Sequence, residues 1–250
     1  MNASTKLLKA AAGAAGGGSV TVDQVFSTFL YDANNTDQNS PGITQTIANE
    51  IDLTEGGLVW IKKRNNESRS NVLIDTLRGA ANALISNTDG PSRTDSTGLD
   101  NGTGAAFTST GFTVGDRSEV NSSNGNTTTA KFVSWTFRKA DKFFLPTTVS
   151  HSNGSSTTVD LSSLGAVGWV TVKRTDGDGD WIVWHRSLTT GNNIKLNSNA
   201  AQTTSNAYLS VSGTTLTISS STPTGSYVIY AWADNSSEDA ADRLISCGSY

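Results

Sequence analysis

The sequence predicts an all-β protein made of two tandem antiparallel β-sandwich modules, of jelly-roll or lectin-like type, that follow a flexible N-terminal arm. Three observations predict this class. Apolar residues make up only 35% of the chain and are gathered into runs of strand length. Ser, Thr, Asn and 24 Gly separate these runs, which suits short strands and polar turns better than helices. The third observation is that the order of the runs occurs twice.

The repeat begins with residues 57–64, GLVWIKKR, which return as GWVTVKR at residues 168–174. In both copies a glycine precedes an apolar run that contains tryptophan and ends in Lys-Arg. Four further landmarks follow in the same order in each copy: 72–78 and 181–186, 84–87 and 196–199, 112–114 and 216–218, and 132–137 and 227–232. Five landmarks in one order indicate two diverged copies of one module.

The duplication divides the chain into four parts. These are an N-terminal anchoring arm at 1–20, a first β-sandwich module at 21–145, a second at 146–240, and a C-terminal strand at 241–250 that could begin a further segment. A chain of 250 residues has room for two modules of about 100 residues each. One large sandwich made from both halves is the alternative.

The first 19 residues have a composition of their own. Their most prominent side chains, followed by a run of Ala and Gly, are Lys6, Leu7, Leu8 and Lys9. A secretory signal would need a stronger apolar core after its basic start, and a flexible leader is another interpretation. We favour an arm in which a short helix around the Leu-Leu pair docks on another subunit, with the glycines as a hinge.

The strands of the first module follow from alternation and from polar turns. Residues 25–31 predict an opening strand that ends in a turn rich in Asp and Asn. Residues 58–64 and 72–77 predict an antiparallel hairpin across a polar loop. Because both faces of 58–61 are apolar, that strand should be central, with its basic end leaving the core. Residues 131–138 predict the closing strand.

The two copies differ in length between the third and fourth landmarks. In the first copy this stretch includes residues 89–104, a polar, turn-rich segment that is longer than its counterpart. An insertion in one copy of a repeat marks an exposed loop, and exposed loops carry binding variation. We therefore expect the charged side chains of this loop, Arg93, Asp95 and Asp100, to face a ligand.

Charge and composition argue against several classes of protein. The net charge is −4, from 18 basic and 22 acidic residues without a basic block, so a nucleic-acid surface is not indicated. No run approaches the roughly 20 apolar residues of a membrane helix. The single cysteine, Cys247, rules out an internal disulfide framework and a Cys-rich metal site.

No catalytic set emerges from the titratable residues. His151 and His185 are the only histidines, and neither lies in a recognised hydrolase or zinc motif; we interpret His185 as a packed or interface residue. The carboxylates Asp75, Glu119 and Asp160 are spread over different elements, so no pair for glycoside hydrolysis is indicated. We therefore expect no catalytic residue, no cofactor and no resident metal.

The DGDGD segment at 176–180 resembles the start of a calcium loop. An EF-hand would need Gly at position 6 and an acid at position 12, where this chain has Trp181 and Ser187. Asp-Gly pairs between strands favour a turn, with weak calcium binding left open. We expect Asp178 on this turn to face a ligand. Of the six tryptophans, Trp181 is our candidate for an exposed ring, because most of the others match between copies.

Eight short segments resemble a known family. They are 25–31 (VFSTFLY), 56–62 (GGLVWIK), 75–79 (DTLRG), 84–88 (LISNT), 135–140 (WTFRKA), 172–174 (VKR), 184–188 (WHRSL) and 245–250 (ISCGSY). Together with the Lys-Leu-Leu leader, they are similar to repeat-bearing virion structural proteins of tailed bacteriophages, cyanophages included. The resemblance covers nearly all of the chain from Val25 onward.

This resemblance implies a non-enzymatic structural protein on the exterior of a phage particle. It suggests a tail fibre or fibre-attachment protein involved in host attachment, with a head-decoration or knob protein as the alternative. The implied partners are tail or capsid subunits, held by the N-terminal arm, and further copies of the chain, with a trimer favoured. A host surface glycan is a further candidate partner, and a polysaccharide-binding or depolymerising protein is the alternative from another class.

Overall fold

The structure is a computed structural model that describes residues 20–36, 43–93, 107–123, 129–204, 208–239 and 243–248. Six of the predicted site residues lie outside these ranges: Lys6, Leu7, Leu8, Lys9, Asp95 and Asp100.

Strands are the main regular secondary structure of the described chain. We call the part from α2 to β8 module 1; its elements are α2 (Val22–Val25), β1 (Phe26–Asp32), β2 (Gln45–Ala48), η1 (Leu53–Glu55), β3 (Gly57–Lys63), β4 (Asn71–Asp75), β5 (Ala83–Ile85), β6 (Phe107–Thr108), β7 (Gly111–Val114) and β8 (Lys131–Arg138). Module 2 follows; its elements are β9 (Phe144–His151), β10 (Thr157–Asp160), η2 (Ser162–Leu164), β11 (Val167–Arg174), β12 (Ile182–His185), β13 (Ile194–Lys195), β14 (Leu209–Ser212), β15 (Thr215–Ile218) and β16 (Gly225–Ala233).

The two modules have the same topology. Each has a five-stranded sheet, in the order β1-β8-β3-β4-β5 or β9-β16-β11-β12-β13, and a three-stranded sheet, in the order β2-β7-β6 or β10-β15-β14. All strand pairs within these sheets are antiparallel. The predicted class, two tandem antiparallel β-sandwich modules, is confirmed.

The strand registers identify equivalent residues in the two modules. Lys63 at the end of β3 lies opposite Phe132 on β8, and Arg174 at the end of β11 lies opposite Tyr227 on β16. The repeat recognised in the sequence therefore corresponds to matching strands, but the Lys-Arg pairs are offset by one residue: Lys63 is equivalent to Arg174 and Lys62 to Lys173. β3 is the central strand of its sheet, as predicted.

The prediction that the basic end of this strand leaves the core is wrong for Lys63, whereas Arg64 is exposed. Lys63 is 3% exposed and Lys173 is 0% exposed. Each ammonium group is kept buried by backbone carbonyls that accept its hydrogen bonds. Lys63 Nζ donates to Ser122 O at 3.1 Å, and Lys173 Nζ donates to Arg174 O at 2.8 Å and Asp89 O at 3.1 Å.

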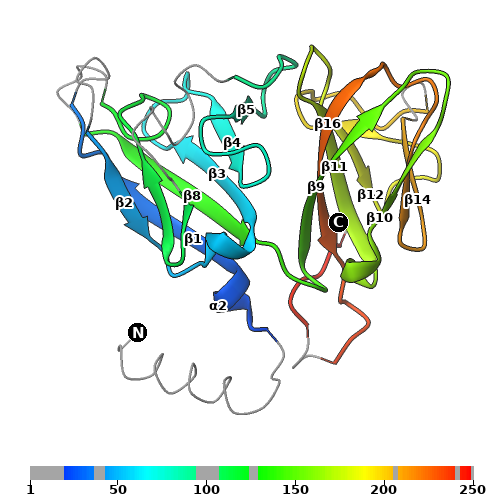
Figure 1. Cartoon of the computed structure of the whole chain (residues 1–250), viewed down its shortest axis with the longest axis horizontal. Helices are drawn as coiled ribbons and strands as arrows, with labels where there is room; N and C mark the ends of the chain where they lie inside the picture. Colours follow the sequence, from blue (N-terminus) through cyan, green and yellow to red (C-terminus); the bar gives the residue numbers. More distant parts are fainter. Residues whose placement is uncertain are drawn as a thin grey trace.

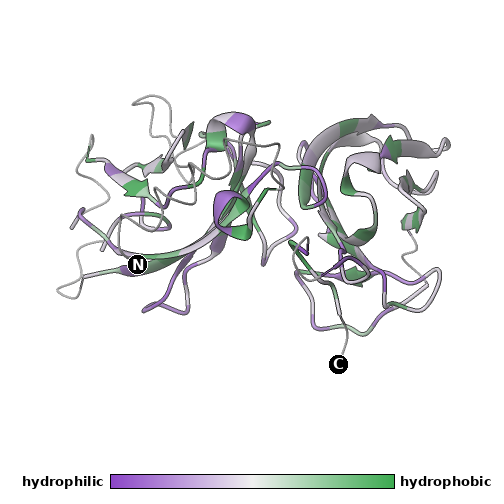
Figure 2. Ribbon diagram, turned by 90° about the horizontal axis from the view of Figure 1, so that it is seen from below, coloured by the Kyte–Doolittle hydropathy of each residue, from purple (hydrophilic) through white to green (hydrophobic). Residues whose placement is uncertain are grey.

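Each module has its own apolar core between its two sheets, as expected of a sandwich. A third apolar cluster, which we call the junction, joins the two five-stranded sheets on their opposite faces. Figures 1 and 2 show the two modules side by side. Its buried members are Val25, Leu58, Leu73, Leu84, Phe143, Phe144, Trp181, Val228, Tyr230 and Trp232. The molecule is therefore layered as three-, five-, five- and three-stranded sheets, with both inner sheets covered on both faces.

Polar contacts reinforce the junction. The Tyr230 hydroxyl in module 2 donates to Asp75 Oδ2 in module 1 at 2.6 Å. Arg78 Nε donates to the same carboxylate oxygen at 2.6 Å, so the buried Asp75 carboxylate has a charged partner. The Trp181 indole N–H donates to Ile85 O at 2.9 Å. These bonds fix the register of one module on the other.

The last described segment, residues 243–248, is not a strand, so the prediction of a C-terminal strand is wrong for these residues. Its backbone bonds largely to side chains at the end of β16 instead of to a sheet ladder. Ile245 N donates to Asn235 Oδ1 at 3.3 Å, and Cys247 N donates to Asp234 Oδ1 at 3.1 Å. Asn235 N in turn donates to Ile245 O at 2.8 Å, which ties the segment to module 2.

Candidate functional site

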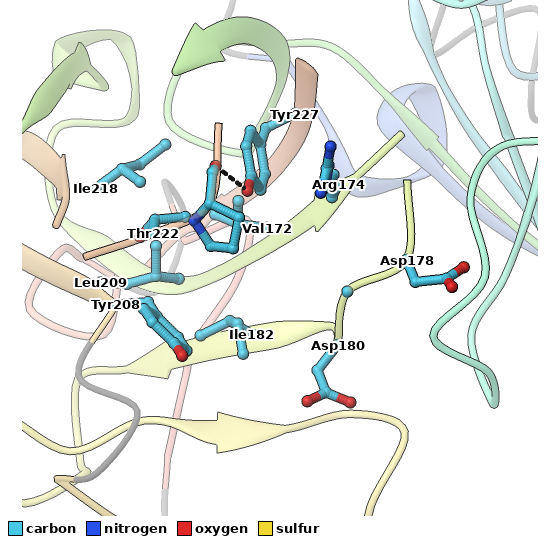
Figure 3. A pocket seen from close by; sticks show the side chains of 12 residues that line it. Val172, Arg174, Asp178, Asp180, Ile182, Tyr208, Leu209, Ile218, Thr222 and Tyr227 are labelled. Atoms are coloured by element: carbon cyan, nitrogen blue, oxygen red, sulfur yellow. Dashed lines mark hydrogen bonds between the residues drawn. The ribbon is translucent and has the colours of Figure 1, made fainter. Parts of the chain in front are cut away.

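A pocket of the described chain lies at one end of the module 2 sandwich, between its two sheets (Figure 3). The cavity has a volume of about 160 Å³. Its lining residues come from β11, β12, β14, β15, β16 and the loops beside them: Val172, Arg174, Asp178, Gly179, Asp180, Ile182, Tyr208, Leu209, Ile218, Thr222, Pro223 and Tyr227. The floor is apolar and belongs to the module core, while the rim carries charged groups.

In module 1 a longer connection lies at the equivalent place. β15 and β16 are joined by only residues 219–224, whereas β7 and β8 are joined by residues 115–130. In that longer connection Val120 is 0% exposed and belongs to the module 1 core. Its carbonyl accepts a 2.7 Å hydrogen bond from the Tyr31 hydroxyl. Module 2 lacks this covering segment, so Arg174 lines an open pocket. The equivalent residue of module 1, Lys63, is covered by the longer connection.

Arg174 is held in place by close packing and by an ion pair. Its Nε lies 2.8 Å from Asp176 Oδ1, and this hydrogen bond lowers the pKa of Asp176. Two glycines make room for the guanidinium group: a Cβ at Gly177 would lie 2.7 Å from Arg174 Cζ, and one at Gly225 would lie 2.6 Å from Arg174 Nε. The absence of a side chain at both positions leaves room for Arg174, and the ion pair with Asp176 orients it on this side of the pocket.

The loop 219–224, which forms another wall, is also fixed. Thr222 O accepts hydrogen bonds from His151 Nε2 at 3.1 Å and from Asn153 Nδ2 at 3.2 Å. The Tyr227 hydroxyl donates to Pro223 O at 2.7 Å, the bond drawn in Figure 3. Burial raises the pKa of Tyr227, so this hydroxyl stays protonated and keeps its donor role at neutral pH. The wall therefore exists before any ligand binds.

The opposite rim carries two carboxylates of the DGDGD turn. Asp180 Oδ2 lies 2.5 Å from Lys195 Nζ, and Asp180 Oδ1 accepts from Asn197 Nδ2 at 2.8 Å. The hydrogen bond from Lys195 lowers the pKa of Asp180, which keeps it ionised. Asp178 is exposed at the mouth. Figure 3 shows Asp178 and Asp180 on one side of the pocket and Tyr208 with Leu209 on the other.

This arrangement can bind a small molecule that has both an apolar face and hydroxyl or amine groups, because an apolar floor with a few fixed polar groups is the usual form of a ligand site. In the part of the chain that the structure covers, no group of three or more His, Cys, Asp and Glu side chains is placed to hold a metal ion. No helix among the described residues is long and apolar enough to cross a membrane.

Only some of the predicted ligand-facing residues lie at the pocket. Asp178 does line the pocket. Arg93 is exposed and its backbone pairs with Ala83. The loop before Arg93 meets the DGDGD turn, because Ser92 N donates to Thr175 O at 2.9 Å and Gly179 N donates to Asp89 O at 2.8 Å. The structure thus brings two predicted loops together, as a contact between modules.

Trp181 corrects the prediction of an exposed ring. It is 0% exposed and lies in the junction, with its ring 6.4 Å from that of Tyr230. The DGDGD turn has exposed carboxylates at Asp176 and Asp178, but its backbone contacts module 1 through Gly179, and the following tryptophan lies in the interface. Module 1 therefore supplies the burial of Trp181.

The other titratable residues have structural surroundings. His185 Nδ1 accepts from Ser187 N at 3.1 Å, and burial lowers the pKa of this imidazole. Glu119 pairs with Arg69 at 3.1 Å, and Asp160 accepts from Ser162 N at 2.8 Å. Asp75 is buried in the junction. The structure brings no two of these carboxylates together in the pocket.

Sequence reasoning missed most of the pocket, including Arg174, Tyr208 and Tyr227. One feature of the sequence could have indicated it. The connection before the last landmark is much shorter in the second copy than in the first, and a missing cover over one end of a sandwich leaves that end open.

A family model matches residues 22–237, nearly all of both modules; the family is described as a domain of unknown function, DUF7483. A search of curated proteins and a search of solved structures each gave no match. Because the family model covers most of the chain, the chain belongs to this family.

Proposed function

We propose that this member of the DUF7483 family is a non-enzymatic structural protein on the exterior of a tailed-phage particle, where it serves as a tail fibre or fibre-attachment protein in host attachment. The phage assignment rests on the resemblance of the segments between residues 25 and 250 to repeat-bearing virion proteins. The N-terminal arm docks on another virion protein, and the two modules project outward, as part of a homotrimer.

The observation that carries a structural role is the junction. The two sandwiches share a buried cluster rich in aromatic rings, including Phe144, Tyr230 and Trp232, and hydrogen bonds cross between them. Interfaces between domains that move are smaller and more polar. A large apolar junction instead joins the modules into one stiff body, which suits a protein that must transmit position and force from a particle to a surface.

The pocket supports the attachment role in particular. Attachment needs a ligand site that exists before contact, and the walls of the pocket are fixed by Arg174, Thr222 and Tyr227. The second candidate function, a polysaccharide-binding protein, is favoured by the same pocket. The two candidates differ in whether the chain is part of a particle.

The test is incorporation into particles. A phage that carries this chain is grown with the full-length protein or with residues 1–18 deleted, and purified particles are imaged at subunit resolution with an antibody to module 2. We expect full-length chain on the tail and none after the deletion, while the isolated truncated protein melts at the same temperature as the full chain. Absence of the full-length protein from particles would refute the proposal. Label on head capsomers would replace the tail fibre with a decoration protein, and normal incorporation of the truncated chain would refute the arm.

A further inference from the structure

We infer that the pocket of module 2 binds one neutral sugar ring, the exposed end or branch of a surface glycan. The inference deepens the proposed attachment role and rests on it for the biological source of the glycan. The binding chemistry follows from the pocket itself. It depends on an apolar floor with tyrosines, on a rim whose charges nearly cancel, and on a size suited to one ring.

The floor and walls suit the apolar face of a pyranose. Val172, Ile182, Leu209 and Ile218 provide aliphatic surface at the bottom, and all four are at most 8% exposed. Tyr208 is half-buried at the mouth, where its ring can cover a ligand and its hydroxyl can reach water or ligand. Tyrosine combines a large apolar surface with a polar tip, which matches a ring that has C–H groups on its face and hydroxyls at its edge.

The charges on the rim favour a neutral ligand over an anion. Arg174 is paired with Asp176, and Lys195 is paired with Asp180. These pairs leave Asp178 as the additional charge at the mouth. A phosphate or carboxylate ligand would have to displace Asp176 from Arg174 and approach two more carboxylates. A hydroxyl group can instead donate to Asp178 or accept from Arg174, and it carries no charge to desolvate.

Size limits the ligand to a single ring. The cavity of about 160 Å³ is several times the roughly 30 Å³ that one water molecule occupies, but it is below the roughly 300 Å³ at which sites for drug-sized ligands begin. An oligosaccharide would have to leave its remaining rings outside, over the exposed Asp178 and Pro223. The pocket therefore recognises an end or a branch of a glycan.

The experiment titrates the full chain with each probe. Calorimetry measures the binding, and the NMR shifts of the tyrosines show where the probe binds. The probes are glucose, galactose, mannose, rhamnose, glucosamine, glucuronate and inorganic phosphate, each used up to concentrations on the order of 10 mM, above the Kd of about 1 mM of a weak contact. We expect at least one neutral sugar to bind and to shift Tyr208 and Tyr227. Tyr208→Ala should weaken that binding about tenfold or more, because it removes the half-exposed ring at the mouth of the pocket.

A matched pair of acidic variants locates the site. Asp178→Asn removes a charged acceptor from the rim and should weaken binding about tenfold, whereas Asp141→Asn, an equally exposed change outside the pocket, should leave it unchanged. Binding of phosphate or glucuronate alone would overturn the ligand class, and neutral-sugar binding that survives Tyr208→Ala would overturn the site. If no probe binds, the inference about the pocket is overturned. The proposed function is then still supported if the chain is found on particles. Sugar binding by a chain that is absent from particles would uphold the pocket and refute that function.

Discussion

The two modules share one topology and differ at one end of the sandwich. In module 1 the connection between β7 and β8 is longer, and its described residues 115–123 place Val120 in the core and cover Lys63, which donates to Ser122 O. In module 2 the six residues 219–224 pass beside the end and leave Arg174 at the edge of a pocket. The strand positions of Lys63 and Arg174 are equivalent. A basic residue at one position of a repeat thus acts as a buried anchor in one copy and as a wall of a pocket in the other, and the length of a neighbouring connection decides which.

The junction joins the two modules, and its loss should have the largest effect. Trp181→Ala removes a ring that is 0% exposed, together with its hydrogen bond to Ile85 O. We expect the free energy of unfolding to fall by about 3 to 5 kcal/mol, as for large aromatic truncations in cores. Urea unfolding followed by tryptophan fluorescence and by circular dichroism measures it, and the two probes should separate as the modules lose their coupling.

The control for this variant is Leu77→Ala. Leu77 is an apolar side chain that is 49% exposed, so its truncation should change stability by no more than about 0.5 kcal/mol. A Trp181→Ala protein as stable as the Leu77→Ala protein would show that the modules do not depend on this contact, and it would remove the basis for treating them as one body.

The connection in module 1 gives the next largest expected effect. Val120→Ala truncates a side chain that seals the end of the sandwich, and it should cost about 1 to 3 kcal/mol. Ser220→Ala is the matched change in the short connection of module 2, where the side chain is exposed, and it should stay within about 0.5 kcal/mol. Thermal unfolding of both variants compares the two ends directly. Equal losses of stability in the two variants would show that Val120 does not close this end of the sandwich.

The sequence predicted the class, the duplication and the central strand, because alternation and repeated order depend on residues near in the chain. It did not predict the burial of Trp181 or of Lys173, because both are covered by the other module and that contact has no local pattern. It placed Asp178 among the ligand-facing residues but missed Tyr208 and Tyr227. These tyrosines meet only after two sheets have packed, and a pocket formed that way is a property of the tertiary structure.

The two buried lysines, Lys63 and Lys173, provide the test with the smallest expected effect on the comparison of the two modules. Burial lowers the pKa of both, and the pKa of Lys173, which lies under Asp89 of module 1, falls to about 8 from 10.5. Between these values the unfolded chain binds more protons than the folded chain, so this group adds stability as the pH rises. We expect the stability of the wild type relative to Lys173→Met to increase by about 1 to 2 kcal/mol from pH 8 to pH 9.5.

The comparison with Lys173→Met is needed because the tyrosines act in the opposite direction. Burial raises the pKa of Tyr31 and Tyr230, so above pH 10 the unfolded chain loses protons that the folded chain keeps, and stability falls for every variant. Chemical denaturation at fixed pH values below 10 separates the two effects. If wild type and Lys173→Met kept a constant difference from pH 7 to 9.5, Lys173 would not be buried under module 1, and the contact between Asp89 and the end of β11 would have to be abandoned. The pH-dependent difference should disappear when Trp181→Ala is added to both proteins. That result would show that the junction causes the burial of Lys173, because a closed junction excludes water from Lys173 and Asp89.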